Sequence, residues 1–141
     1  MIRRGEQATE NAGYIASVEE RPIVRTMLIV EDDEYIGEVL VQAIVQETSY
    51  LAVLVPDGQA ALHAAAEIKP SLFILDYQLP RMNGIELYDR LHAMPELGKV
   101  PAMMISARLP QRELEKRDIL GMHKPLDLDE FLQAIDSLLQ H

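Results

Sequence analysis

The sequence predicts an α/β protein built on a doubly wound parallel sheet, with helices covering both faces of the sheet. Short apolar runs alternate along the chain with segments of helical hydrophobic period, which is the order expected of repeated strand–helix units. The apolar runs are continuous, as in strands that are buried on both faces. The length of 141 residues, of which 48% are hydrophobic, suits one domain with a substantial core.

Four predicted strands are runs of consecutive apolar residues that end at polar residues or at a turn. They are 26–30, 51–55, 72–75 and 102–105. The first run is followed by three acids, and the third leads directly into Asp76. A fifth strand is expected at 120–123, although the residues Leu-Gly-Met-His have a poor strand propensity.

Helices are predicted where apolar residues recur every three or four positions. This period runs through residues 36–44, 61–68, 84–94 and 128–139. Pro70 ends the second of these helices, because proline cannot continue a helix. Asp127, with Glu130 three residues later, resembles a capping box at the start of the last helix.

Composition and charge limit what the chain can do. The 13 Lys and Arg against 23 Asp and Glu give a net charge of -10, and so acidic a surface repels the phosphates of nucleic acids. Cysteine is absent, which excludes disulfides, thiolate metal sites and cysteine nucleophiles. No apolar run approaches the about 20 residues of a membrane span, and the N-terminus lacks the apolar stretch of a secretory signal. We therefore expect a cytoplasmic protein that binds neither nucleic acid nor membrane.

The N-terminal segment differs from the rest of the chain. It lacks sustained apolar periodicity and ends at Pro22, so residues 1–22 are expected to be a flexible extension and residues 23–141 the domain. Residues 1–25 carry four arginines and four glutamates, and the whole net charge of -10 therefore belongs to residues 26–141.

Side chains suited to phosphoryl chemistry follow the predicted strands. In parallel α/β sheets, sites form outside the carboxyl ends of the strands. The residues at these ends are Glu31, Asp32, Asp33, Asp76, Ser106 and Lys124. Clustered carboxylates repel one another unless a cation lies between them, and their hard oxygens suit Mg²⁺. A carboxylate there can also attack phosphorus to form an aspartyl phosphate, while metal, ammonium and hydroxyl neutralise the phosphoryl oxygens.

Four motifs, in this order, resemble the receiver domain of bacterial response regulators. They are Val30-Glu31-Asp32-Asp33, the Asp-x-x-x-Pro-x-x-x-Gly stretch from Asp76 to Gly84, Ile105-Ser106-Ala107 and His123-Lys124-Pro125. The resemblance covers the chain from Thr26 to Gln140 and implies the flavodoxin-like receiver fold, a doubly wound sheet of five parallel strands. It also implies two-component signalling, in which Asp76 accepts a phosphoryl group from a histidine kinase or a phosphotransfer protein.

The resemblance implies a magnesium site as well. Asp32 would be the principal ligand, and Glu31 would act largely through water. Asp76 and the backbone carbonyl of Gln78 would complete the protein's share of the coordination of Mg²⁺.

The phosphoryl oxygens would be held by Ser106, by Lys124 and by the backbone N–H of Ala107, again as the resemblance implies. The protein would signal through protein contacts or as a phosphorelay intermediate. It would be no enzyme beyond catalysing its own phosphorylation and dephosphorylation. We expect a stand-alone receiver without an effector domain. The sequence is also compatible with a homodimer.

The chain departs from the family pattern between Ser106 and Lys124. Receivers typically carry an aromatic residue three positions before the lysine, where this chain has Gly121. The intervening segment is also shorter than usual and leaves only 110–118 for a fourth helix, which we expect to be shortened or unwound. Because the usual aromatic switch cannot operate, we hypothesise that phosphorylation changes the order of residues 107–120.

Two other functions fit many of the same residues. A pseudo-receiver that is never phosphorylated and serves only as an interaction module would be consistent with Gly121. An aspartate-nucleophile hydrolase of the haloacid-dehalogenase type also places an aspartate at a strand end. Such a phosphohydrolase needs a second acid two residues later, where this chain has Gln78.

Overall fold

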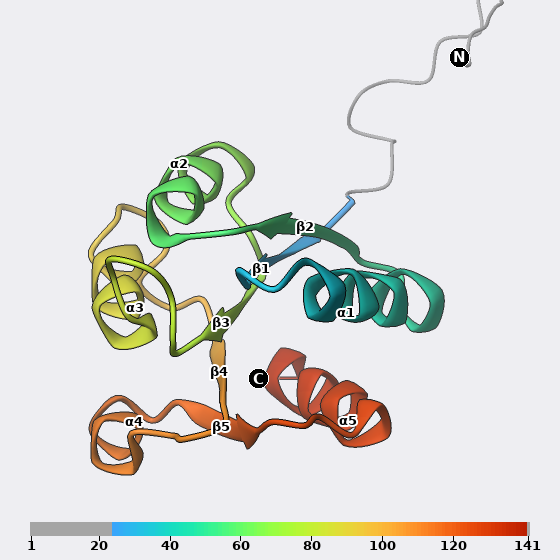
Figure 1. The fold of residues 1–141 in the computed structure, drawn as a ribbon. Helices are drawn as coiled ribbons and strands as arrows, with labels where there is room; N and C mark the ends of the chain where they lie inside the picture. The colour runs from blue at the N-terminus through green and yellow to red at the C-terminus, as the bar shows by residue number, and fades with distance from the viewer. Residues whose placement is uncertain (1–23, 141) are drawn as a thin grey trace, which may run out of the picture.

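The computed structural model describes residues 24–140, which form one parallel sheet with helices on both sides (Figure 1). The strands are β1 (Thr26–Val30), β2 (Leu51–Val55), β3 (Leu72–Asp76), β4 (Ala102–Ser106) and β5 (Leu120–His123). The helices are α1 (Glu34–Glu47), α2 (Gly58–Ile68), α3 (Gly84–His92), α4 (Gln111–Arg117) and α5 (Leu128–Leu139). The sheet order is β2-β1-β3-β4-β5, with every neighbouring pair parallel. The predicted doubly wound α/β fold is therefore confirmed.

The two faces of the sheet bury separate hydrophobic cores, because side chains alternate along each strand. In β1, Leu28 and Val30 join the core that contains residues of α2, α3 and α4. Met27 and Ile29 join the other core, with residues of α1 and α5. Figure 1 shows the helices in these two groups on opposite sides of the sheet. Each fully buried aliphatic side chain contributes about 1.5–3 kcal/mol, and together they hold the carboxyl ends of the strands in line.

Four helices begin at a side chain that caps the first turn. Asp33, Asp57, Asn83 and Asp127 each accept the N–H three residues further on, at 2.9–3.0 Å. Glu86 returns the contact to the Asn83 N–H, which completes a capping box. Such caps stabilise a helix by about 1 kcal/mol each. Asp33 thus caps α1. The other two acids after β1, Glu31 and Asp32, do not cap the helix and are candidates for a functional site.

The described structure refines three of the predicted elements. α3 ends at His92, two residues before the predicted end, since the residue before Pro95 is disfavoured in a helix. α4 is a folded helix of seven residues, so it is shortened and not unwound. β5 forms at the predicted residues despite its poor propensity, because it pairs with β4 from Met103 to Ser106.

The predicted extension, residues 1–22, lies outside the described residues, and so does the domain boundary at residue 23. The described chain enters the sheet beside β2, where the Arg25 carbonyl accepts the Leu51 N–H at 2.9 Å. Among the helices of residues 24–140, none has the length and hydropathy that crossing a membrane requires.

Candidate functional site

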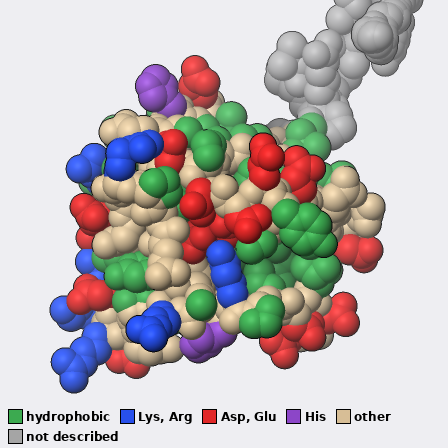
Figure 2. Space-filling model, viewed as in Figure 1, with side chains coloured by type: hydrophobic (Ala, Val, Ile, Leu, Met, Phe, Trp, Pro, Cys, Tyr) green, Lys and Arg blue, Asp and Glu red, His purple; other side chains and the backbone are tan. Residues whose placement is uncertain are grey.

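Charged side chains from three strands meet at the carboxyl edge of the sheet. Glu31 follows β1, Asp76 is the last residue of β3, and Lys124 follows β5. Figure 2 shows acidic side chains gathered beside a basic one near the middle of this face. Because β1 and β3 are neighbours in a parallel sheet, their ends lie side by side. The fold therefore brings together groups that are far apart in the sequence.

Lys124 bridges two buried carboxylates. Its Nζ lies 3.1 Å from Oδ2 of Asp76 and 3.0 Å from Oε1 of Glu31. Burial acts to lower the pKa of Lys124, but the two carboxylates together outweigh burial and raise it. The Lys124 N–H also donates to the Ser106 carbonyl at 3.0 Å, which fixes the base of the side chain at the end of β4. The ammonium is thus held charged beside Asp76.

Glu31 is 3% exposed and is incompletely paired. Its Oε2 accepts the Asp33 N–H at 3.1 Å. Its Oε1 lies near Lys124, but no donor reaches it with hydrogen-bond geometry. Burial, and next the neighbouring Asp76, raise the pKa of Glu31 to about 7, against the opposing effects of the Asp33 N–H and Lys124. A second cation beside Glu31, in addition to Lys124, would offset the cost of keeping it ionised.

Asp76 is 4% exposed and is contacted at both carboxylate oxygens. Oδ2 accepts from Lys124, and Oδ1 accepts the Gln78 N–H at 3.1 Å. The backbone beside it is tightly packed, because a Cβ added at Gly84 would lie 2.7 Å from the Asp76 carbonyl oxygen. Only glycine allows α3 to begin so close to β3. These contacts give the Asp76 carboxylate a fixed orientation at the edge of the sheet.

Three residues provide the donor atoms of a candidate cation site. One carboxylate oxygen from each of Glu31, Asp32 and Asp76 lies within 4.8 Å of the others. Asp32 is exposed, whereas Glu31 and Asp76 are buried, so the site is open to water on one side. All three donors are hard oxygens, the ligands that Mg²⁺ prefers. The donor set, and the Oε1 of Glu31 that accepts no hydrogen bond, therefore fit a magnesium ion.

The Ser106 hydroxyl takes part in a turn, and its hydrogen bonds are made to Arg108 and not to Asp76. Ser106 is 1% exposed, and its Oγ donates to the Arg108 carbonyl at 2.9 Å and accepts the Arg108 N–H at 3.0 Å. Ala107 and Gln78 are exposed at the ends of β4 and β3. The sequence analysis missed the contact with Arg108. The hydroxyl bonds to the backbone of Arg108, and any residue type at that position would offer the same backbone groups. A serine at the end of a strand, where such turns occur, is the only available signal.

The fold and the site together define the class of protein, a flavodoxin-like α/β domain with a lysine-bridged pair of carboxylates at the carboxyl edge of its sheet. The family model of the response regulator receiver domain matches residues 27–136, and the chain therefore belongs to this family of two-component signalling proteins.

Relatives and solved structures agree with this assignment. The polar-differentiation response regulator DivK of Brucella anthropi is 28% identical over 119 residues, which cover 82% of this chain and 96% of that protein. The chemotaxis protein CheY4 of Vibrio cholerae shares the fold with a TM-score of 0.76 and 21% identity, over 83% of this chain and 100% of that one. A CheY-like receiver domain from Methanospirillum hungatei has a TM-score of 0.77 and 20% identity, over 84% and 95%. The resemblance inferred from the motifs is confirmed.

Proposed function

We propose that this receiver accepts a phosphoryl group on Asp76 from a histidine kinase or a histidine phosphotransfer protein, in a reaction that requires Mg²⁺. The main support is the Lys124 ammonium, 3.1 Å from Oδ2 of Asp76, beside the carboxylates of Glu31 and Asp32. Fixed positive charge at this position stabilises the charge that develops during phosphoryl transfer. The proposed setting is the cytoplasm, and the output is a protein contact or onward phosphorelay.

In the proposed step, a carboxylate oxygen of Asp76 attacks the phosphorus of a phosphohistidine. An O–P bond forms while the N–P bond breaks, and the imidazole nitrogen keeps the electron pair of the broken bond. Lys124 stabilises the charge on the phosphoryl group throughout. Mg²⁺ supplies further charge neutralisation when it is bound. Its ligands would be Asp32, Asp76, the carbonyl of Gln78 and, through water, Glu31.

The remaining phosphoryl oxygens are proposed to be held by Ser106 and by the backbone N–H of Ala107. Both residues lie at the end of β4, which neighbours β3 in the sheet. A hydroxyl has one proton to donate, and that of Ser106 goes to the Arg108 carbonyl. Holding a phosphoryl oxygen therefore requires Ser106 to change its partner.

The phosphodonor protein is proposed to dock on an apolar groove beside the site. The groove is lined by Tyr35, Ile36, Val39, Leu40, Lys124, Pro125, Leu126 and Leu128. Because Lys124 belongs to both groove and site, a protein seated here is close to Asp76. Tyr35 is 77% exposed and Leu128 39% exposed, and exposed apolar side chains gathered at one groove are typical of a contact surface.

Intact-mass measurement after treatment with a small-molecule phosphodonor and Mg²⁺ tests the proposal. We expect a gain of one phosphoryl group that hydroxylamine removes, and no gain for Asp76→Asn. Asp57→Asn is the matched control, because Asp57 also follows a strand but its carboxylate caps α2 through the Ala60 N–H, and this variant should be phosphorylated normally. A folded wild-type protein that gains no mass would instead be a pseudo-receiver, an interaction module without phosphorylation.

A further inference from the structure

The helices on the two faces of the sheet differ in charge. α1 and α5, which pack on the same face, contain six acidic residues and neither Lys nor Arg. The six are Glu34, Glu38, Glu47, Asp129, Glu130 and Asp136. In Figure 2 the basic side chains lie on the left of the view, apart from the one near the middle. The right side, where Figure 1 places α1 and α5, shows only acidic side chains among the charged ones. The surface formed by α1 and α5 is therefore strongly negative.

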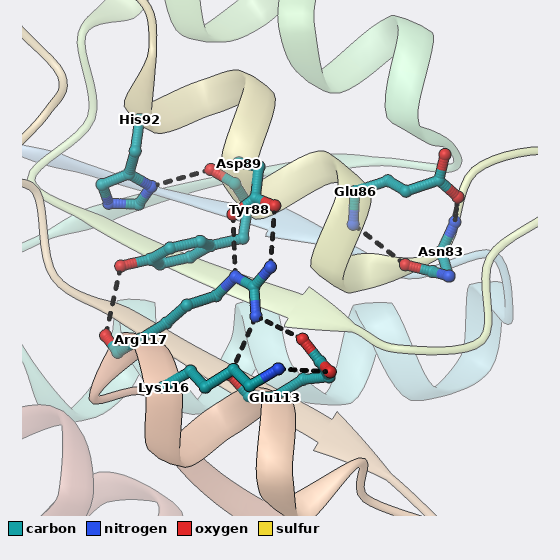
Figure 3. A network of polar contacts seen from close by, with 8 residues as sticks. All are labelled: Asn83, Glu86, Tyr88, Asp89, His92, Glu113, Lys116 and Arg117. Carbon is teal, nitrogen blue, oxygen red and sulfur yellow. Dashed lines mark hydrogen bonds and ion pairs between the residues drawn. The ribbon is translucent and has the colours of Figure 1, made fainter.

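The charges on the other face of the sheet are largely paired with one another. Arg117 of α4 contacts both carboxylate oxygens of Asp89 of α3, at 2.8 and 2.9 Å, and lies 2.7 Å from Glu113 (Figure 3). Nζ of Lys116 lies 3.5 Å from Glu113. Within residues 24–140, by contrast, no ion pair joins an acid of α1 or α5 to a basic residue. No Lys or Arg of the described chain thus offsets the charge of these two helices by direct contact.

An open groove of about 620 Å³ runs along α1 on this acidic surface, and we call it the α1 groove. Two rows of α1 side chains, each with a spacing of four residues, line it beside Leu128 of α5. The apolar row is Tyr35, Val39 and Ala43. The polar row begins with Glu34 and Glu38 and continues with two glutamines. An apolar row beside acids is typical of a contact surface for a partner that is apolar and basic.

The shape of the α1 groove suits a helix. The lining of α1 extends from Tyr35 to Gln46, which is three helical turns and spans about 16 Å. A bound strand would need free backbone groups at a sheet edge, whereas α1 presents side chains. An amphipathic helix instead packs lengthwise on such a surface through its apolar side chains.

We propose that the α1 groove binds a cationic amphipathic helix of a partner protein. Its apolar side chains would lie on the row from Tyr35 to Ala43, with Lys or Arg beside Glu34 and Glu38. A second copy of this chain is a poor occupant, because the same surface on both copies would bring acids against acids. Tyr35 also lines the groove that is proposed for the phosphodonor protein, so a bound helix covers part of that groove. The inference goes beyond the proposed function and does not depend on phosphorylation.

Fluorescence anisotropy with the full chain and a labelled helical peptide of about 18 residues tests the inference. The peptide carries a leucine stripe flanked by lysines. One comparison peptide has glutamate in place of each lysine, and another has the same composition without the stripe. We expect the lysine peptide with the stripe to bind at least about tenfold more tightly than either. Its binding should weaken at least about fivefold when salt rises from about 0.05 to about 0.3 M. Neither phosphodonor nor Mg²⁺ is added, so the result is independent of the proposed phosphorylation.

Two substitutions of exposed glutamates separate the α1 groove from the overall charge. Glu38→Lys should weaken binding of the lysine peptide at least about tenfold. Glu115→Lys, on α4, makes the same change in net charge and should bind nearly as the wild type does. Tyr35→Ser, at an exposed position, should also weaken binding, because it removes an apolar contact.

Four outcomes would overturn the inference. They are equal losses for Glu38→Lys and Glu115→Lys, equally tight binding of a comparison peptide, binding that does not respond to salt, and no binding of the lysine peptide. Sedimentation of the full chain alone gives a further check. A dimer that Tyr35→Ser dissociates would show that a second copy occupies the α1 groove, against the inference.

Discussion

The Nζ of Lys124 and Oδ2 of Asp76 lie 3.1 Å apart, although 48 residues separate them in the sequence. The same Nζ lies 3.0 Å from Oε1 of Glu31. One ammonium therefore lies between two buried carboxylates and offsets part of the repulsion between them. A change in any of these three charges alters the stability of the fold as well as the chemistry of the site.

Replacing Lys124 with methionine is expected to lower the free energy of unfolding by roughly 1–3 kcal/mol, because two buried carboxylates lose their partner. This range is below that of a fully buried pair, since the Lys124 side chain is 22% exposed. Urea denaturation with a chelator present measures the loss, and added Mg²⁺ should restore part of it. The exposed Lys99→Met is the control and should unfold as the wild type does. Equal stability of Lys124→Met and wild type would contradict the bridging role.

Asp32 and Asp33 are adjacent acids, but they should respond differently to substitution. Asp33 caps α1 through the Ile36 N–H, so Asp33→Ala should destabilise the protein by about 1 kcal/mol and leave Mg²⁺ binding nearly unchanged. Asp32→Ala should weaken Mg²⁺ binding at least about tenfold, since it removes a ligand oxygen. Calorimetric titration with Mg²⁺ compares the two variants. A larger loss of affinity in Asp33→Ala would show that the assigned ligand is wrong by one residue.

The raised pKa of Glu31 predicts a pH-dependent loss of stability. Its pKa is about 7 in the fold against 4.5 in the unfolded chain, so between these values the folded state binds more protons. The free energy of unfolding should therefore fall as pH rises from 4.5 to 7. Glu31→Gln carries no such charge and should gain stability relative to wild type across this range. Urea midpoints at both ends of the range, in the absence of divalent cations, measure the difference. A constant difference between the two proteins would refute the assignment.

Adding a methyl group at Gly121 should strain the packing of Leu114 and Leu109, the two side chains that lie against this glycine. Gly121→Ala is expected to cost about 1–2 kcal/mol of stability, because its Cβ would press against Leu114 and Leu109. Gly98→Ala is a matched control, since the nearest atom to its Cβ lies at 3.4 Å. Truncation in Leu109→Ala should relieve part of the strain, so the double variant should lose less than the two single variants combined. Strict additivity in this cycle would mean that Leu109 does not pack on Gly121.

The predicted strands and most helix positions could be read from the sequence because their signals are local. Continuous apolar runs indicate strands buried on both faces, and Pro70 lies two residues after the last residue of α2. The gathering of Glu31, Asp32, Asp76 and Lys124 was predictable as well. Parallel strands place their carboxyl ends at one edge of the sheet, so residues that follow different strands become neighbours.

Other features depended on contacts that no local pattern encodes. The packing of segments distant in sequence sets three of these features. They are the orientation of Lys124 beside Asp76, the Oε1 of Glu31 that accepts no hydrogen bond, and the position of Leu109 next to Gly121. α4 is folded although it has few apolar residues, with Leu114 buried in the core and Arg117 paired with Asp89 of α3. The partner of the Ser106 hydroxyl is a backbone group, and backbone groups are chemically alike in nearly every residue. The sequence thus determined which elements form and which charges share the edge of the sheet, whereas tertiary packing decided the contact that each side chain makes there.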